Sequence, residues 1–490
     1  MKHSITINRA YQADTTRLLA AILELLTYLI AIGLGVFCFL MGWIGIDAAA
    51  VLTLLLVIAL ICRSWNQFDC GRHPCFFFLC TLAVFQAGRV MVPGGEATGL
   101  FRVTLMTSSQ FDVSQEVAAT ALLAIALSAV AIYSPCRWNY RALPRPKIES
   151  LTPFLTYLYW LLYCTLPVQL FKNYRYYQYA QEHGGYLAFF VDHGGLASNI
   201  PMAVRAVSLI SLPALVGIFV LERRKKFLYP AVTAYFIIAA PVLLIGSRGG
   251  IFSLILSLWY VAKIKSEQPG RLSTFAFLGI GLALLGALVG GFRNKESQST
   301  ILAVPSQFVE EQGISLDVTE VAIAFRQRFT PHIASYLLSE IESAFVADDQ
   351  TNYVGGKRFA DDVAFFLNPV AYQLGFGSGS SYLAEAYVFG GLWGVVLISL
   401  LLGLGLRGMH AHSENPLVLF VVAMILPDVL WMARGGLLGW LSALVRVGIS
   451  GSLMIVGWWG YKSAVSIGGV LWRNGCRQEA GRLAPSGQYP

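Results

Sequence analysis

Charged side chains are scarce in this sequence of 490 residues. Asp, Glu, Lys and Arg make up 13% of the positions, and hydrophobic residues make up 56%, with a mean hydropathy of +0.62. Soluble domains carry about 25% charged residues, because they must cover a core with a water-facing surface. The composition therefore excludes a soluble globular protein and indicates a polytopic membrane protein.

Cysteines are missing from two long segments between the apolar runs, 172–199 and 293–381. No disulfide framework is therefore implied. Cys70-Gly-Arg-His73-Pro-Cys75 groups three possible metal ligands. Closed zinc sites use four ligands at settled spacing, so an ordinary reduced loop is the preferred interpretation of this motif.

The chain is rich in long hydrophobic runs. A bilayer core takes about 20 apolar helical residues, and twelve runs approach or exceed that length. They lie at 18–42, 47–62, 75–92, 115–133, 152–171, 200–221, 228–246, 250–263, 272–292, 382–406, 416–434 and 436–460, of which 47–62 and 250–263 are short. The sequence predicts an all-α polytopic membrane protein with about twelve transmembrane helices, nine of them in 18–292 and three in 382–460.

Lys and Arg set the expected orientation, because short loops rich in them stay in the cytoplasm. They gather in 1–17, in the loops after the second, fourth, sixth, eighth and tenth runs, and in 461–490. Both termini are therefore expected on the cytoplasmic side. The segment 172–199 and the large loop 293–381 are then expected on the outer face.

The loop 293–381 is the only large block unable to cross a bilayer. Its apolar residues at 314, 318, 321, 325 and 329 predict a helix over about 314–329. Thr330 and Pro331 match the N-cap and first position of a second helix over 331–345. His332 would then lie at the positive end of that helix, where the dipole favours a neutral imidazole that can accept a proton.

Glu340 and Glu342 follow on the second helix as further candidates for proton transfer, and a solvated polar face is the alternative interpretation. Arg205 lies one turn into the sixth run. An arginine at that depth is costly and usually faces a cavity, a partner or an anionic ligand.

The motif Leu244-Ile-Gly-Ser-Arg-Gly-Gly250 lies at the outer end of the seventh run. Its glycines permit close backbone approach, and Ser247 and Arg248 add donors. An arginine with free backbone N–H groups at a helix N-terminus suits a diphosphate. A tight turn with a snorkelling arginine is the alternative.

Three features occur in order along the chain: Gly246-Ser-Arg-Gly, an Arg-rich outer loop with a Gly-Gly/Gly-Lys element, and Ser380-Ser-Tyr-Leu-Ala-Glu-Ala-Tyr-Val-Phe-Gly-Gly-Leu-Trp-Gly394. This order resembles the Wzy-type oligosaccharide repeat-unit polymerases, also called O-antigen polymerases. The resemblance covers about residues 200–410, and the first five runs match only in hydropathy. Where many relatives carry Pro-Arg late in the loop, this chain has Leu367-Asn-Pro-Val370, so the phosphate contact expected there is absent or is supplied by Lys357 or Arg358.

The resemblance implies a multi-pass enzyme of the bacterial inner membrane with its active site facing the periplasm. It would transfer a growing glycan from undecaprenyl diphosphate to a hydroxyl of the next lipid-linked repeat unit, without nucleotide sugar, cofactor or metal. The loop holds no Asp-x-Asp, and Asp348-Asp349 and Asp361-Asp362 are weak alternatives as metal ligands. A flippase and a chain-length regulator are the implied protein partners, and no nucleic acid is involved.

Such a reaction needs a base for the acceptor hydroxyl and cations for the departing diphosphate. His332 is the expected base, and Glu340 and Glu385 are the next candidates. Glu385 lies at the start of the 382–406 run, where an unpaired carboxylate is costly. The expected diphosphate ligands are Ser247, Arg205, Arg248, Arg293, Arg326 and Arg328.

Two other functions fit parts of the pattern. A flippase or transporter of lipid-linked sugars would need arginines lining a cavity that opens to both faces. Most charge outside the cytoplasmic loops lies on the outer side instead, which favours an enzyme working at one face. An O-antigen ligase shares the outer-loop plan but uses a lipid A acceptor.

Overall fold

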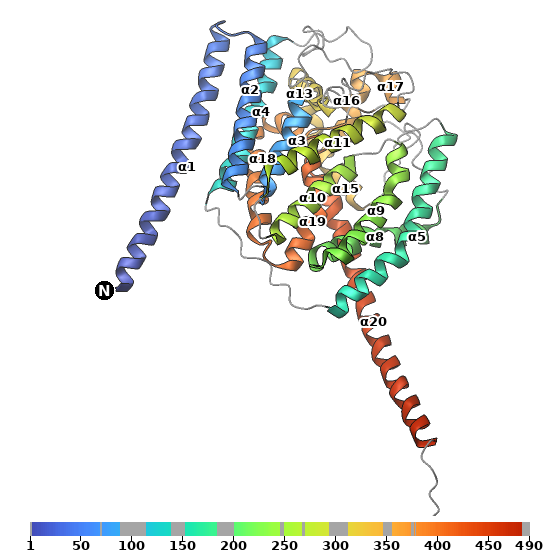
Figure 1. Cartoon of the computed structure of the whole chain (residues 1–490). Coiled ribbons are helices and arrows are strands. Elements are labelled where there is room, and N and C mark those ends of the chain that lie inside the picture. The colour runs from blue at the N-terminus through green and yellow to red at the C-terminus, as the bar shows by residue number, and fades with distance from the viewer. Residues whose placement is uncertain are drawn as a thin grey trace, which may run out of the picture.

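The computed structural model describes residues 2–68, 71–88, 114–138, 152–183, 200–245, 249–266, 270–293, 312–345, 355–373, 377 and 379–482 (Figure 1). In 2–18, 287–293, 344–345, 371 and 464–482 it describes the backbone without the side chains.

Every regular element within these ranges is a helix. The helices are α1 (Lys2–Leu40), α2 (Ile46–Gln67), α3 (Pro74–Gln86), α4 (Gln115–Arg137), α5 (Thr152–Glu182), α8 (Met202–Leu221), α9 (Lys225–Ile245), α10 (Gly249–Lys265), α11 (Leu272–Arg293), α13 (Ser315–Ala324), α14 (Arg326–Phe329), η4 (Thr330–His332), α15 (Ile333–Phe345), α16 (Phe359–Leu367), α17 (Pro369–Gln373), α18 (Tyr382–Ala411), α19 (Pro416–Trp431) and α20 (Trp440–Arg482). Each of the twelve hydrophobic runs contains one of them. The all-α polytopic class is confirmed.

Eight helices in the described part of the chain are long and apolar enough to cross a membrane. They are Leu19–Leu40, Ile46–Gln67, Gln115–Arg137, Pro153–Glu182, Met202–Leu221, Lys225–Ile245, Tyr382–Ala411 and Trp440–Ser463. Three further apolar helices, including α3 and α19, are shorter. The 13 residues of α3 extend about 20 Å, less than the hydrocarbon core of about 30 Å. Within the described residues, eight of the twelve runs thus coincide with helices of full spanning length.

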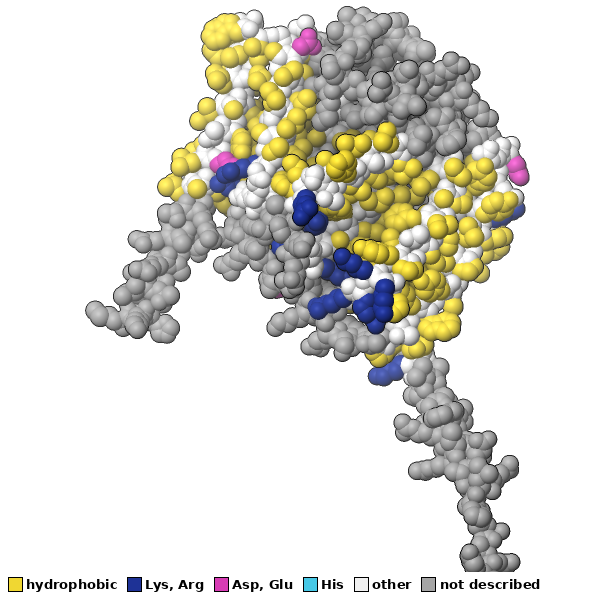
Figure 2. Space-filling view, viewed as in Figure 1, with side chains coloured by type: hydrophobic (Ala, Val, Ile, Leu, Met, Phe, Trp, Pro, Cys, Tyr) yellow, Lys and Arg dark blue, Asp and Glu magenta, His cyan; other side chains and the backbone are white. Residues whose placement is uncertain are grey.

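The bundle has two different ends. We call the end that carries α13, α15 and α16 the site end, and the end from which α20 extends the tail end (Figure 1). Figure 2 shows hydrophobic side chains over most of the visible described surface, with basic side chains gathered toward the tail end. The long helices therefore present the apolar surface that a bilayer requires.

Helices α4 and α18 pack closely at the centre of the core. A Cβ added at Gly403 of α18 would lie 2.5 Å from the carbonyl oxygen of Ile132 in α4, so only glycine permits this approach. Ser128 of α4 hydrogen-bonds with Tyr382 and accepts a hydrogen bond from Ser399 at 3.1 Å. These contacts fix the first turn of α18, which carries Glu385, against α4.

Helix α13 lies inside the bundle. Residues 315–322 are all buried, and the helix packs against α3, α4 and α18. Where the sequence predicts one helix over 314–329, the chain turns at Phe325, which leaves the helical region with φ −116° and ψ 29°. Part of the large loop therefore belongs to the core. On α13 the polar side chains Asp317 and Glu320 are buried as well as the predicted apolar stripe.

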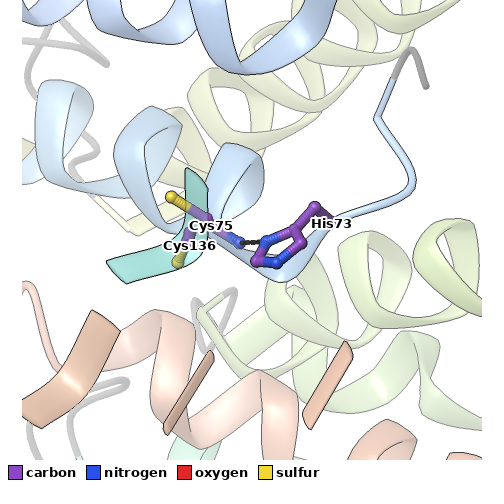
Figure 3. Close-up of side chains that lie close together, drawn as sticks. All are labelled: His73, Cys75 and Cys136. Atoms are coloured by element: carbon purple, nitrogen blue, oxygen red, sulfur yellow. Dashed lines mark hydrogen bonds between the residues drawn. The ribbon is translucent and has the colours of Figure 1, made fainter. Parts of the chain in front are cut away.

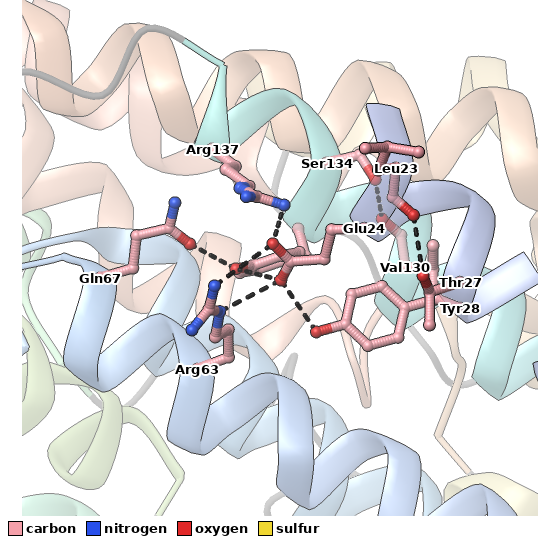
Figure 4. A network of polar contacts seen from close by, with 10 residues as sticks. Leu23, Glu24, Thr27, Tyr28, Arg63, Gln67, Val130, Ser134 and Arg137 are labelled. Atoms are coloured by element: carbon pink, nitrogen blue, oxygen red, sulfur yellow. Dashed lines mark hydrogen bonds and ion pairs between the residues drawn. The ribbon is translucent and has the colours of Figure 1, made fainter. Parts of the chain in front are cut away.

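Helix α1 stands at the edge of the bundle and is joined to it by one polar cluster (Figure 4). Glu24 accepts a hydrogen bond from Arg63 of α2 at 3.2 Å and forms an ion pair with Arg137 of α4. Tyr28 donates to the same carboxylate at 3.0 Å. No residue of the α1 span is fully buried within the protein. Leu25 and Ile32 also pack against the core, and this cluster adds the described polar contacts of α1 with α2 and α4.

Candidate active site

Two carboxylates from different helices meet at one short segment of the site end. We call residues 432–439, between α19 and α20, the Arg434 loop. Glu340 of α15 accepts a hydrogen bond from the backbone N–H of Leu438 through Oε2. Glu385 of α18 accepts one from the N–H of Leu437 at 2.8 Å. Consecutive peptide donors thus hold both side chains.

The glycines of the Arg434 loop make this approach possible. A Cβ added at Gly436 would lie 1.4 Å from Oε1 of Glu340. A Cβ added at Gly435 would lie 3.1 Å from Cδ1 of Trp431. Ser380 donates a hydrogen bond to the other oxygen of Glu385 at 2.5 Å. Because Gly435 and Gly436 have no side chains, the carboxylates can reach the backbone N–H groups of the loop.

Glu340 lies outside the membrane-spanning helices, and its environment changes its acidity. Burial raises the pKa of the Glu340 carboxyl to about 7, an effect that the Leu438 N–H and the charge of Arg358 oppose. Glu385 lies close enough for its charge to interact with that of Glu340. A carboxyl with this pKa can both take up and release a proton near neutral pH.

Buried hydrogen bonds anchor the Arg434 loop to the bundle. The side-chain amide of Gln86, at the end of α3, donates to Ser381 Oγ at 2.7 Å and to the Ala433 carbonyl at 2.6 Å. Thr319 of α13 donates to the same amide at 3.1 Å. The Tyr382 N–H donates to the Met432 carbonyl at 3.1 Å. The buried helix α13 thereby helps to position the loop.

Arg434 is the cation of this loop. Its Nη1 donates to Gln312 at 2.8 Å, and its guanidinium lies 6.0 Å from the ring centroid of Phe85 and 5.8 Å from that of Trp431. Sequence reasoning missed it, because it falls at the end of the apolar run 416–434. A signal was present: Arg434-Gly-Gly repeats the Arg248-Gly-Gly pattern at the end of another run.

Gly249, the last residue of the Gly-Ser-Arg-Gly motif, borders the same loop. A Cβ at Gly249 would lie 2.3 Å from the Trp431 ring, so α10 begins in direct contact with the residue that precedes the Arg434 loop. Ser247 and Arg248 lie outside the described residues. The structure thus brings the start of α10 to the loop that holds Glu340 and Glu385.

His332 occupies a different position. Its ring packs against Gly356, where φ is +77° and an added Cβ would lie 2.5 Å from Nδ1. The Gly356 N–H donates to Asp362, which also accepts from Tyr336 at 2.6 Å. Among the described residues, no hydrogen bond joins His332 to Glu340 or Glu385.

The helix start expected before His332 is absent. The Thr330 hydroxyl donates back to the Arg326 carbonyl at 2.8 Å instead of capping, and Phe329, Thr330 and Ile333 all have helical backbone angles. The chain therefore runs from α14 through η4 into α15 without a free helix N-terminus. The expected dipole effect on His332 lacks its structural basis.

Arg326 and Arg328 point to separate neighbours. Arg326 donates through Nε to the Val388 carbonyl at 3.4 Å, next to the break in α18 at Gly390 and Gly391. Arg328 lies 4.6 Å from the ring centroid of Phe366. As their spacing suggests, the two side chains do not converge on one ligand.

The two remaining expected diphosphate ligands lie on other helices. Arg205 of α8 has its Nε buried and lies beside Lys172 of α5, whose Nζ donates to Ser208 at 3.1 Å. Arg293 ends α11, and its side chain is outside the described residues. No described contact joins Arg205 to the Arg434 loop.

Fold and site together define a class: a polytopic helical membrane protein that gathers two buried carboxylates and Arg434 at one short loop between its helices. The family model described as O-antigen polysaccharide polymerase Wzy matches residues 22–459. The chain belongs to this family, whose members polymerise O-antigen repeat units, and the match includes the first spans as well as the motifs at 200–410. Searches of the curated proteins and of the solved structures gave no match.

Proposed function

We propose that the chain polymerises repeat units carried on undecaprenyl diphosphate, in the bacterial inner membrane, with its site end facing the periplasm and both termini in the cytoplasm. The basic side chains gathered at the tail end support this orientation. The convergence of Glu340 and Glu385 on the Arg434 loop is the observation that carries the proposal.

The proposed reaction is one displacement. A hydroxyl oxygen of the incoming lipid-linked repeat unit attacks the anomeric carbon of the growing glycan. A C–O bond forms there, the bond from that carbon to the diphosphate oxygen breaks, and undecaprenyl diphosphate leaves with the electron pair. The hydroxyl proton passes to a carboxylate of the protein.

Glu340 is the proposed base. Its pKa of about 7 matches the requirement that a general base be ionised near neutral pH and still hold a proton. Glu385 is the proposed positioning residue, since it accepts the adjacent Leu437 N–H and lies close enough to Glu340 for the two groups to interact electrostatically. This assignment gives Glu340 the role that the sequence alone gave to His332.

Arginines are proposed to receive the departing diphosphate. Arg434 belongs to the loop that holds both carboxylates, and α10, which follows Ser247 and Arg248 in sequence, begins in contact with Trp431 beside the same loop. Planar guanidinium groups pair well with phosphate oxygens and stabilise charge that develops on the leaving group. The diphosphate charge is then met by protein cations, so the proposed transfer needs no divalent ion at this site.

A flippase or a ligase would use the groups differently. In a flippase the lipid-linked sugar changes leaflet and no bond forms, so a base has no role. A ligase transfers to lipid A. Under the proposal the chain accepts substrate that a flippase delivers, and a chain-length regulator acts on its product.

Purified protein in vesicles, given undecaprenyl-diphosphate repeat units and EDTA, should produce a ladder of longer glycans. The matched control is Glu342→Gln on the exposed face of α15, which should leave the ladder intact. Translocation without elongation would contradict the polymerase mechanism. A ladder that forms only after Mg²⁺ is added, and not after Zn²⁺ is added, would contradict the metal-independent step.

A further inference from the structure

A second cluster of reactive side chains lies at the tail end, away from the carboxylates. His73 directly precedes α3, Cys75 lies in its first turn, and Cys136 lies in the last turn of α4 (Figure 3). One nitrogen of His73 and the two sulfur atoms all lie within 4.8 Å of one another. His73 is 1% exposed, Cys75 0% and Cys136 1%.

A fourth side chain joins this cluster from another helix. The ring centroid of His410, near the end of α18, lies 4.5 Å from that of His73, and His410 is 4% exposed. Two thiols and two imidazoles from α3, α4 and α18 thus meet in a region that the protein buries. The motif Cys70 to Cys75 alone supplies only part of this set.

We propose that His73, Cys75, Cys136 and His410 bind one structural Zn²⁺ ion. Two sulfur and two nitrogen ligands are a preferred zinc set, arranged as a tetrahedron. Bond lengths of about 2.0–2.3 Å place tetrahedral ligand atoms about 3.3–3.8 Å apart. The 4.8 Å limit on the ligand atoms of His73, Cys75 and Cys136 requires a contraction of about 1 Å, and His410, whose ring centroid lies 4.5 Å from that of His73, must turn one nitrogen toward the same point.

Charge balance favours this ion in a membrane bundle. Binding releases one proton from each thiol, so the two thiolates carry two negative charges and the imidazoles remain neutral. With Zn²⁺ the site has no net charge. A neutral site avoids the cost of placing an ion in a low-dielectric interior.

To bind the ion, His73 must give up one hydrogen bond. Its Nδ1 now accepts the N–H of Cys75 at 3.0 Å (Figure 3). The same lone pair would bind zinc, and the Cys75 N–H would donate to a thiolate sulfur instead. Cys136, whose Sγ now donates to the Gly403 carbonyl at 3.3 Å, would lose that hydrogen bond with its proton.

The ion would join three helices that the site depends on. α3 carries Gln86, and α18 carries Glu385, both at the opposite end of the bundle. Under the proposed orientation the cluster faces the cytoplasm, where thiols stay reduced. Zinc at the tail end would stabilise the packing of α3, α4 and α18 and take no part in glycan transfer.

Metal content of the purified full-length protein tests the proposal. Mass spectrometry of the metal should find about one zinc per chain after gel filtration. Cys136→Ser and His410→Gln should each lower the zinc content at least five-fold. Cys80→Ser is the matched control, since Cys80 lies on α3 outside the cluster and its loss should leave the content unchanged.

A second measurement does not depend on the variants folding. Wild-type protein produced with Co²⁺ in place of Zn²⁺ should show a thiolate-to-cobalt charge-transfer band in the near ultraviolet. Wild-type protein that carries no stoichiometric metal, or that carries copper or iron instead, would overturn the assignment. Because the readout is metal and not glycan, failure here leaves the polymerase proposal standing.

Discussion

Glu340 and Glu385 accept hydrogen bonds from adjacent peptide groups, those of Leu438 and Leu437. The two glutamates come from helices that are separated in sequence by the whole of α16 and α17. A single segment therefore controls both side chains, and a shift of that segment would move the proposed base and its neighbour together.

Replacing Glu340 with Gln should lower the polymerisation rate about 10²–10⁴-fold, because general-base catalysis contributes about that much. The amide keeps the size of the side chain and can still accept the Leu438 N–H, so membrane insertion should be normal. The rate of glycan elongation in vesicles measures the loss. Full activity in Glu340→Gln together with an inactive His332→Gln would return the base role to His332.

Activity should depend on the ionisation of Glu340. With a pKa of about 7, about a tenth of the carboxyl is ionised at pH 6, so the rate should rise through pH 7 and level off above pH 8. Glu340→Asp should keep a pH-dependent residual rate, and Glu340→Gln should remove the dependence. A wild-type profile that is flat from pH 5.5 to 8 would contradict the assignment.

The ionisation of Glu340 should affect stability in the opposite direction to activity: as pH rises, activity should rise and stability should fall. Its folded pKa of about 7 lies above the ordinary value of 4.5, so the folded protein binds more protons than the unfolded chain between these limits. The contribution of Glu340 to the free energy of unfolding should therefore fall as pH rises from about 4.5 to 7. Thermal unfolding of the wild type and Glu340→Gln across this range measures the difference.

Gly436→Ala should displace Glu340, because the new methyl group would coincide with its carboxylate. A displacement of about 1 Å can cost about 10²-fold in rate. Gly439→Ala is the matched control, since the nearest atom to its Cβ lies 3.6 Å away. Elongation rates of the two variants, compared at equal levels of inserted protein, test the contact. Equal activities would show that Glu340 adjusts without loss.

Arg434→Ala should lower the maximal rate about 10²–10³-fold, as expected when one donor to a developing anion is removed. Arg434→Lys should recover only part of the lost rate, because an ammonium lacks the planar donor pair of a guanidinium. Arg446→Ala is a suitable control, since Arg446 pairs with Asp428 on the exposed side of α19 and α20. If only the control were impaired, Arg434 would not contact the diphosphate.

The long apolar runs predicted the helices well, because hydropathy depends on local composition and a bilayer imposes a minimum length. Glu385 was also identifiable, since a carboxylate at the start of an apolar run is costly without a partner. Glu340 was a candidate as an acidic residue on the helix that follows His332. Their common contact was not predictable. That contact depends on the backbone N–H groups of Leu437 and Leu438, and no residue type or motif in the sequence indicates their role.

Two further features could not be predicted from local patterns. Helix α13 carries Asp317 and Glu320 and therefore looks like a water-facing helix, yet it fills the space between α3, α4 and α18. Cys136 and His410 lie far from His73 in sequence and meet it only in the folded bundle. In both cases tertiary packing decided the outcome.

The polar cluster at Glu24 bears on how the protein is made. Helix α1 emerges from the ribosome first, whereas Arg63 and Arg137 are synthesised later, in α2 and α4. At about 5–20 residues per second, Glu24 waits on the order of ten seconds for Arg137. During that interval its carboxylate has no completed set of cations. The attachment of α1 through this cluster is therefore complete only after α4 has been synthesised.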